Sequence, residues 1–197
     1  MKRYETMLKT AWLIAIVAII FVGCSADHPM NPEPLSNNGR IVQSETGPVT
    51  ILGPSETLKA KAALYKSASG TDVHNEQYVE AATGGEVGVG NGDLGYSKVI
   101  FNSNALPENA TVSVTYRENE FCEGEFGPHG VQFNESVEIE LSYLNADLTN
   151  VDESTLQIYY YNESTGLWEY VGGTVDTTRK VVSVNLEHFS RYAIVKT

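Results

Sequence analysis

Apolar and polar residues alternate along much of the chain after residue 80, and the period is two residues. In Ser136–Tyr143 every second residue is apolar. Because successive side chains of a strand point to opposite faces of a sheet, this pattern predicts a half-buried strand. We expect its buried face to hold Val137, Ile139, Leu141 and Tyr143, and its exposed face to hold Glu138, Glu140 and Ser142. Thr111–Tyr116 alternates in the same way.

Other short segments of β-branched and aromatic residues extend this pattern. Asn162–Gly166 has the composition of a hairpin turn, and a second turn at Asp176–Lys180 is expected to join the strands on either side of it. Ser55–Lys66 fits a capped helix or a strand equally well. Short strands at this spacing predict an all-β fold, a single antiparallel β-sandwich. The further strands are expected at 48–52, 84–89, 98–101, 156–161, 167–171, 181–186 and 188–195.

The first 24 residues have the pattern of an export signal. Lys2, Arg3 and Lys9 precede an apolar run that ends in Gly23-Cys24. The run is shorter than the roughly 20 residues that a membrane-spanning helix needs, which favours a cleaved leader over a retained anchor helix. The last four residues of this segment resemble the lipobox of bacterial lipoproteins. This resemblance implies acyl chains, palmitate among them, on Cys24.

The leader predicts where the protein resides and how the chain is divided. We expect an exported, membrane-anchored lipoprotein of the bacterial cell envelope, and Ser25 after the cysteine favours the outer membrane. The predicted parts are a signal peptide (1–23), a lipidated N-terminus and flexible tether (24–46), an extension of uncertain structure (47–80) and the sandwich (81–197). The tether is inferred from its Pro, Asn, Ser and Gly content, which offers little apolar surface to bury.

Charge and cysteine content narrow the possible partners. The chain has a net charge of −12, and we expect no nucleic-acid partner for so acidic a protein, since phosphate backbones bind basic surfaces. If Cys24 is lipidated, Cys122 has no partner for a disulfide within the chain. We expect Cys122 to be a buried hydrophobic residue near a strand end, the alternative being a reactive thiol.

Two local motifs suggest ligands but have simpler explanations. Residues 90–95 match the glycine pattern G-x-G-x-x-G, yet strands are predicted on both sides, which favours a turn over a phosphate site. The acidic runs are expected to be solvated loops, with a calcium site as the alternative, although the spacing of a calcium-binding loop is absent. They comprise Glu118, Glu120, Glu123 and Glu125, and then Asp147, Asp152 and Glu153.

Aromatic residues and histidines are the remaining candidates for a site. The aromatics of 159–161 with Trp168 and Tyr170 are expected to form cross-strand pairs, the alternative being a carbohydrate-binding face. No metal-binding or nucleophile motif is present, so we expect no metal, no cofactor and no enzymatic activity. The histidines are His28, His74, His129 and His188.

One tripeptide, His188-Phe189-Ser190, has the groups needed for self-cleavage. The Ser190 hydroxyl follows a peptide carbonyl that it can attack in an N→O acyl shift, and His188 can carry the proton. Three residues do not by themselves supply the strain that this reaction needs. We therefore expect the motif to be structural, with Phe189 and Tyr192 in the core and the chain intact.

Several segments between 84 and 195 resemble the ZU-five domain, the β-sandwich module of ankyrins and netrin receptors. The resemblance rests on Gly84-Gly85 with Val87, on 99–101, on 105–114, on Pro128-x-Gly130-x-x-Phe133, and on the closing 188–193. Asn102-Ser103-Asn104 and Ser136 depart from the family pattern. The resemblance implies an interaction module, some of whose members cleave themselves within His-Phe-Ser.

These observations predict a non-enzymatic, lipid-anchored envelope protein that binds another protein or a surface polymer. The alternatives are a self-processing domain that is cut at Phe189–Ser190, and a calcium- or glycan-binding module.

Overall fold

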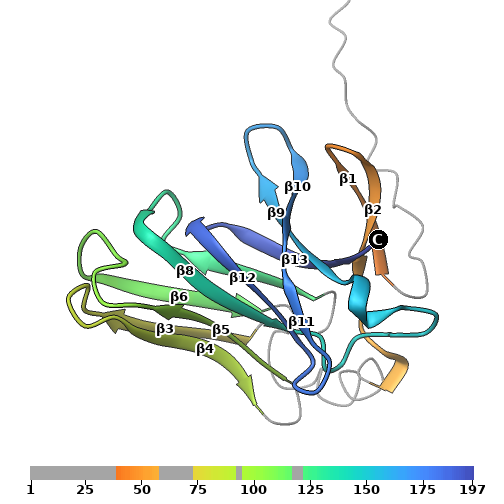
Figure 1. Ribbon diagram of the computed structural model, residues 1–197, viewed down its shortest axis with the longest axis horizontal. Helices are drawn as coiled ribbons and strands as arrows, with labels where there is room; N and C mark the ends of the chain where they lie inside the picture. Colours follow the sequence, from red (N-terminus) through yellow and green to blue (C-terminus); the bar gives the residue numbers. More distant parts are fainter. Residues whose placement is uncertain (1–38, 58–72, 92–94, 117–121) are drawn as a thin grey trace, which may run out of the picture. The chain divides into compact units, whose positions relative to one another are not determined.

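The computed structural model describes residues 39–57, 73–91, 95–116 and 122–197, and these residues form an all-β sandwich, as the alternation predicts (Figure 1). The larger sheet has eight strands, in the order β2 (Gly47–Leu52), β1 (Gly39–Ser44), β10 (Leu167–Gly172), β9 (Gln157–Asn162), β13 (Arg191–Lys196), β7 (Glu123–Gly127), β6 (Ala110–Tyr116) and β3 (Val73–Val79). The smaller sheet has five, in the order β11 (Thr174–Asp176), β12 (Val181–His188), β8 (Gln132–Ser142), β5 (Gly95–Phe101) and β4 (Gly85–Asn91). A 3-10 helix, η1 (Glu153–Thr155), precedes β9.

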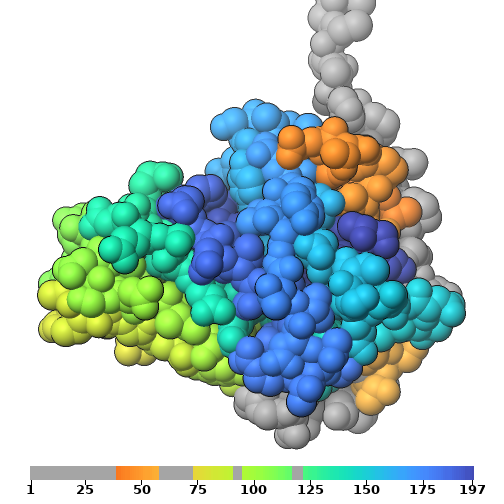
Figure 2. Space-filling model, viewed as in Figure 1, coloured from red at the N-terminus to blue at the C-terminus, as the bar shows by residue number. Residues whose placement is uncertain are grey.

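The main core lies between the two sheets. Val137, Ile139, Leu141 and Tyr143 are all buried, which confirms the buried face predicted for this segment. The opposite face of β8 is only partly exposed, because Glu140 and Ser142 are buried as well. Of the three residues predicted for the polar face, Glu138 is exposed as expected, whereas Glu140 and Ser142 are not. Strand β8 has a neighbour on each side, β12 and β5, and Figure 2 shows the blue residues of β12 beside the teal residues of β8.

A second, smaller core lies on the other side of the larger sheet. Strand β2 pairs with β13 as well as with β1, so β2, β1, β10, β9 and β13 form a closed ring of strands. Ile51, Trp168 and Val195 are buried inside this ring. Strand β9 therefore buries both faces, with Ile158 in the main core and Tyr159 in the smaller one.

The folded body begins earlier than the sequence predicts. Residues 39–46 were expected to belong to the tether, but β1 pairs with β2 along its whole length, from Gly39 opposite Leu52 to Ser44 opposite Gly47. Residues 47–80, whose structure was left open, contribute β2 and β3 to the larger sheet. Polar composition misled the prediction here, because β1 is stabilised by strand pairing and by burial against distant strands. Residues 55–66, for which a helix and a strand were both possible, lie mostly outside the described residues.

The chain changes sheets at Gly172-Gly173. The predicted turn at Asp176–Lys180 does form a hairpin, but it joins β11 to β12, whereas β10 belongs to the other sheet. Gly172 and Gly173 have φ angles of 103° and 147°, which residues with a Cβ rarely adopt. A Cβ on Gly173 would also lie 2.7 Å from Val182 Cγ1. The glycine pair thus permits the crossover between the sheets.

Candidate binding groove and the His-Phe-Ser segment

The outer face of the five-stranded sheet carries a row of alternating charges. Lys98 Nζ lies 2.7 Å from Glu86 Oε2 and 3.8 Å from Glu140 Oε2. Arg179 donates to Glu140 Oε1 at 2.8 Å and to Asp176 Oδ2 at 2.7 Å. The hydrogen bonds from the backbone and side chain of Arg179 lower the pKa of Asp176, and the bond to Glu86 raises the pKa of Lys98. Lys98, Arg179, Glu86, Glu140 and Asp176 form what we call the paired row, and each of these charges has an oppositely charged partner within the fold.

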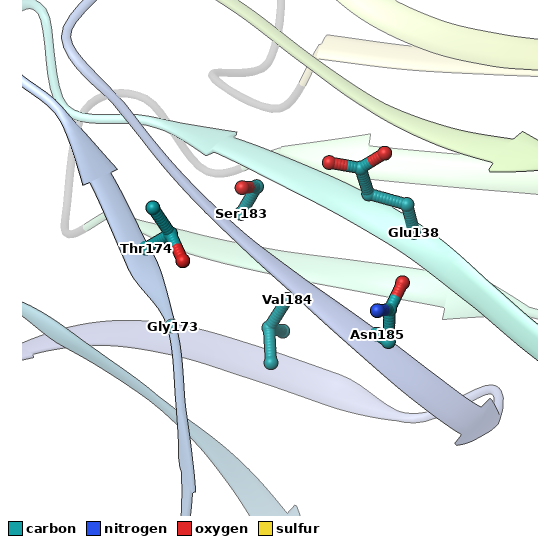
Figure 3. Close-up of a pocket in the computed structure, with 6 residues that line it drawn as sticks. All are labelled: Glu138, Gly173, Thr174, Ser183, Val184 and Asn185. Carbon is teal, nitrogen blue, oxygen red and sulfur yellow. The ribbon is translucent and has the colours of Figure 1, made fainter.

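Beside the paired row lies a polar groove of about 470 Å³, lined by Glu138, Gly173, Thr174, Ser183, Val184 and Asn185 (Figure 3). Its polar side chains come from three strands of the same sheet: Thr174 from β11, Ser183 and Asn185 from β12, and Glu138 from β8. Thr174, Asn185 and Glu138 are exposed and Ser183 is half-buried. We call this site the β11–β12 groove.

Strand register places these side chains together. Thr174 is opposite Ser183, and Asn185 is opposite Glu138. Directly opposite residues of an antiparallel pair lie on the same face. Strand β11 pairs with β12 only from Val181 to Ser183, and the chain then leaves the sheet at Gly173. The space beyond the end of β11 is the groove.

The polar side chains of the groove are not used by the fold. Among the described residues, Glu138, Thr174, Ser183 and Asn185 have no side-chain hydrogen bond or ion pair. A carboxylate, two hydroxyls and an amide thus offer both donors and acceptors to a ligand. The sequence analysis missed this set. In the sequence, the only sign of the groove is the polar face of two alternating segments, those of β8 and β12. The register in which these strands pair does not follow from the alternation.

The His-Phe-Ser segment is held by contacts that use each of its groups. Phe189 is buried and packs edge-on against Phe101 and Phe133, with ring centres 5.9 and 4.8 Å away. The Ser190 hydroxyl donates to the backbone oxygen of Tyr161 at 3.2 Å. His188 Nδ1 lies 3.2 Å from the carbonyl oxygen of Phe189. This carbonyl belongs to the Phe189–Ser190 peptide bond, which self-cleavage would break.

Tyr192 completes the packing around this segment. Its hydroxyl donates to the backbone oxygen of His188 at 2.8 Å, and burial raises its pKa. Tyr192 is 1% exposed, so both Phe189 and Tyr192 lie in the core, as the sequence predicts. The described hydrogen bond of Ser190 goes to Tyr161, and no described contact joins the His188 ring to that hydroxyl.

The clustered aromatics form cross-strand pairs. Trp168 is opposite Tyr161 and Tyr170 is opposite Tyr159, with ring centres 5.4 and 5.5 Å apart. Trp168 and Tyr159 are buried, and the Arg191 guanidinium lies 4.1 Å from the centre of the Tyr161 ring. Tyr159, Tyr161 and Trp168 therefore belong to the smaller core, whereas Tyr170 is 59% exposed and packs edge-on against Tyr159.

The first acidic run is not a solvated loop where the structure describes it. Glu123 begins β7 and is only 3% exposed, and its two carboxylate oxygens lie 2.6 Å from Arg40 and 3.3 Å from Arg191. These arginines come from β1 and β13, so the prediction failed because the partners of Glu123 are remote in sequence. Glu125 lies in β7 as well and is half-buried. Glu118 and Glu120 lie outside the described residues.

Cys122 is a free thiol directly before β7. It is 6% exposed, and burial raises its pKa to about 12. Its burial confirms the prediction of a buried residue near a strand end. The raised pKa disfavours the thiolate, which is the reactive form of cysteine.

Other predicted features fall partly or wholly outside the described residues. The lipidation site Cys24, the leader and His28 lie there, as do the three central residues of the G-x-G-x-x-G match. Asn91 and Gly95, which belong to that match, pair with each other at the end of β4 and β5, so the match lies between two antiparallel strands, as predicted. Within the described ranges no helix has the length and apolarity to span a membrane, and no group of three His, Cys, Asp or Glu is arranged to hold a metal ion.

Comparison with known proteins gives one partial match. The sequence matches no protein-family model. A segment of 57 residues is 42% identical to part of an amylopullulanase from Thermoanaerobacterium thermosulfurigenes. The match covers 29% of this chain and 3% of the enzyme, so only this segment corresponds to a very small part of that much longer protein.

Proposed function

We propose that this chain is a non-enzymatic, lipid-anchored protein of the bacterial cell envelope whose β-sandwich binds another protein or a surface polymer. The leader-like segment that ends at Cys24 supports the anchor. A single acyl chain is a marginal anchor, so firm attachment would need the two or three chains that lipoprotein processing supplies. On this proposal the residues between Cys24 and Gly39 connect the lipid to the folded body.

The observation that carries the binding function is the β11–β12 groove, with four polar side chains that have no partner among the described residues. Polar groups that a fold does not pair are available to a ligand. The partial match is consistent with a module, because the matched segment is a small part of a long enzyme. A polysaccharide-degrading enzyme as the relative favours a surface polymer over a protein as the partner.

The anchor is tested by Cys24→Ser in the expressed full chain. The variant should leave the membrane fraction or retain its leader, because the thiol is the site of lipid attachment. A Cys24→Ser protein that fractionates and migrates like the parent would contradict the lipoprotein proposal. Ser25→Ala is the matched control, since it leaves the thiol in place.

The binding function is tested by incubating the purified full chain, in detergent, with envelope extracts and identifying what is retained. Partners that the parent retains and the Glu138→Gln/Asn185→Ala variant loses would support binding through the groove. If the parent and the variant retain the same partners equally, the chain binds them through another part of its surface.

Self-processing at Phe189–Ser190 remains the alternative of another class. It is favoured by one contact, the His188 Nδ1 that lies 3.2 Å from the Phe189 carbonyl oxygen, where a ring N–H can polarise the carbonyl. The Ser190 hydroxyl would first have to leave Tyr161. We therefore retain the structural interpretation of this segment.

A further inference from the structure

We propose that the β11–β12 groove binds a neutral polysaccharide through the side chains of Glu138, Thr174, Ser183 and Asn185. This inference rests on the proposed binding function and names its ligand class and site. The side chains project from three adjacent strands of one sheet around a common hollow (Figure 3). Because these residues lie on paired strands, their backbone is already ordered, and only side-chain freedom is lost on binding.

The first argument concerns hydrogen bonding. A sugar ring carries several hydroxyls, each of which donates and accepts. The groove matches them with two hydroxyls at Thr174 and Ser183, an amide at Asn185 and a carboxylate at Glu138. None of these groups has a side-chain partner among the described residues, so no internal bond has to break before a sugar binds.

The second argument concerns charge. The lining of the groove contains no cation, and Arg179 and Lys98 of the adjoining paired row are each bound to carboxylates of that row. The groove's only charged lining residue is Glu138, and the whole chain carries −12. An anionic polymer would therefore be repelled. A lone carboxylate is also a poor calcium site, because Ca²⁺ takes six to eight oxygen ligands.

The third argument favours a polysaccharide over a peptide. Protein interfaces depend on aromatic and apolar anchors that fill pockets. Val184 is the only apolar residue in the lining of the groove, and its side chain packs against the main core.

The test is affinity electrophoresis of the full chain, purified in detergent, through gels that contain pullulan, a neutral polysaccharide. We expect pullulan to retard the parent and polygalacturonate, an anionic polysaccharide, to leave its migration unchanged. The Glu138→Gln/Asn185→Ala variant should bind pullulan about tenfold more weakly, through the loss of hydrogen bonds. The matched control is Glu76→Gln/Gln77→Ala on β3, an exposed strand of the other sheet, which removes the same charge and one amide.

Each outcome decides the proposal. The proposal is supported if pullulan retards the parent and the control variant but not the groove variant. The circular dichroism spectra of all three proteins must then be the same. Retardation that the groove variant keeps would overturn the site, and a parent that pullulan does not retard would overturn the ligand class. Membrane fractionation and partner capture would still test the envelope function separately. A protein partner lost by the groove variant, without pullulan binding, would replace the polysaccharide with a peptide ligand.

Discussion

The two halves of the outer face of the five-stranded sheet use polar residues in opposite ways. In the paired row, Glu140 is only 7% exposed and contacts both Arg179 and Lys98. Two residues earlier on the same strand, Glu138 is exposed and has no side-chain partner among the described residues. In the sequence, both glutamates occupy polar positions of the same alternating segment. Their difference teaches that a polar position on a strand contributes to folding only where neighbouring strands bring it a partner, and is otherwise available for binding.

The core beneath both halves should show the largest effect. Ile139 lies between the two glutamates in sequence, is fully buried and packs in the main core. Ile139→Ala should lower the free energy of unfolding by about 2–5 kcal/mol, because apolar contacts are lost and a cavity remains. Chemical denaturation of parent and variant measures this. A variant as stable as the parent would mean that the assignment of faces on β8 is wrong.

The comparison itself is tested by matched substitutions of the two glutamates. Glu140→Gln should cost about 1–3 kcal/mol, because Arg179 and Lys98 lose a buried charged partner. Glu138→Gln should change stability by less than about 0.5 kcal/mol, as surface substitutions without such contacts do. Denaturant midpoints of the two variants decide the matter. Equal losses would remove the distinction between the two halves.

A smaller effect is expected from acid. Hydrogen bonds from Arg179 lower the pKa of Asp176, and those from Lys180 lower the pKa of Glu153. A carboxyl with a lowered folded-state pKa adds stability above its unfolded pKa and loses it as the pH falls through the folded value. Thermal unfolding should therefore be steady from pH 7 to about 5 and decline below about pH 4. Asp176→Asn should flatten part of that decline, and an unchanged profile would contradict the role of the pair.

We expect no cleavage of the Phe189–Ser190 bond, which follows the end of β12. The contacts of Phe189, Ser190 and Tyr192 are structural, so the purified chain should remain whole. Denaturing mass spectrometry is the appropriate measurement, because a cleaved Ser190–Thr197 would remain paired in the sheet under native conditions. Loss of that mass, abolished in Ser190→Ala, would make His188 and Ser190 catalytic residues.

The fold class and most strands were predictable because their determinants are local. In β6 and β8 the alternation of apolar residues marks which side chains are buried, and burial on one face is enough to specify a strand. The failures occurred where distant residues decide. Strand β7 carries Glu123, whose burial depends on Arg40 and Arg191. Strand β1 is stabilised by pairing with β2 and β10, which a polar local composition does not indicate.

The candidate site was less predictable than the fold. The roles of Cys122, Phe189 and Tyr192 followed from their apolar character and their place near strand ends, and the structure buries all three. The groove could not be found in that way, because it depends on where β11 stops pairing and on which residues face each other across β12.

The sequence by itself determined that the body is an all-β sandwich, and that its last segment packs Phe189 and Tyr192 inward. Period-two alternation and turn composition are local properties, and each can be read without knowing the neighbours of a strand. Only the tertiary structure decided which polar residues are paired and which are free. A polar side chain has the same local pattern in either case, and only the tertiary structure brings Arg179 to Glu140 and places Glu138 and Asn185 in the lining of the groove.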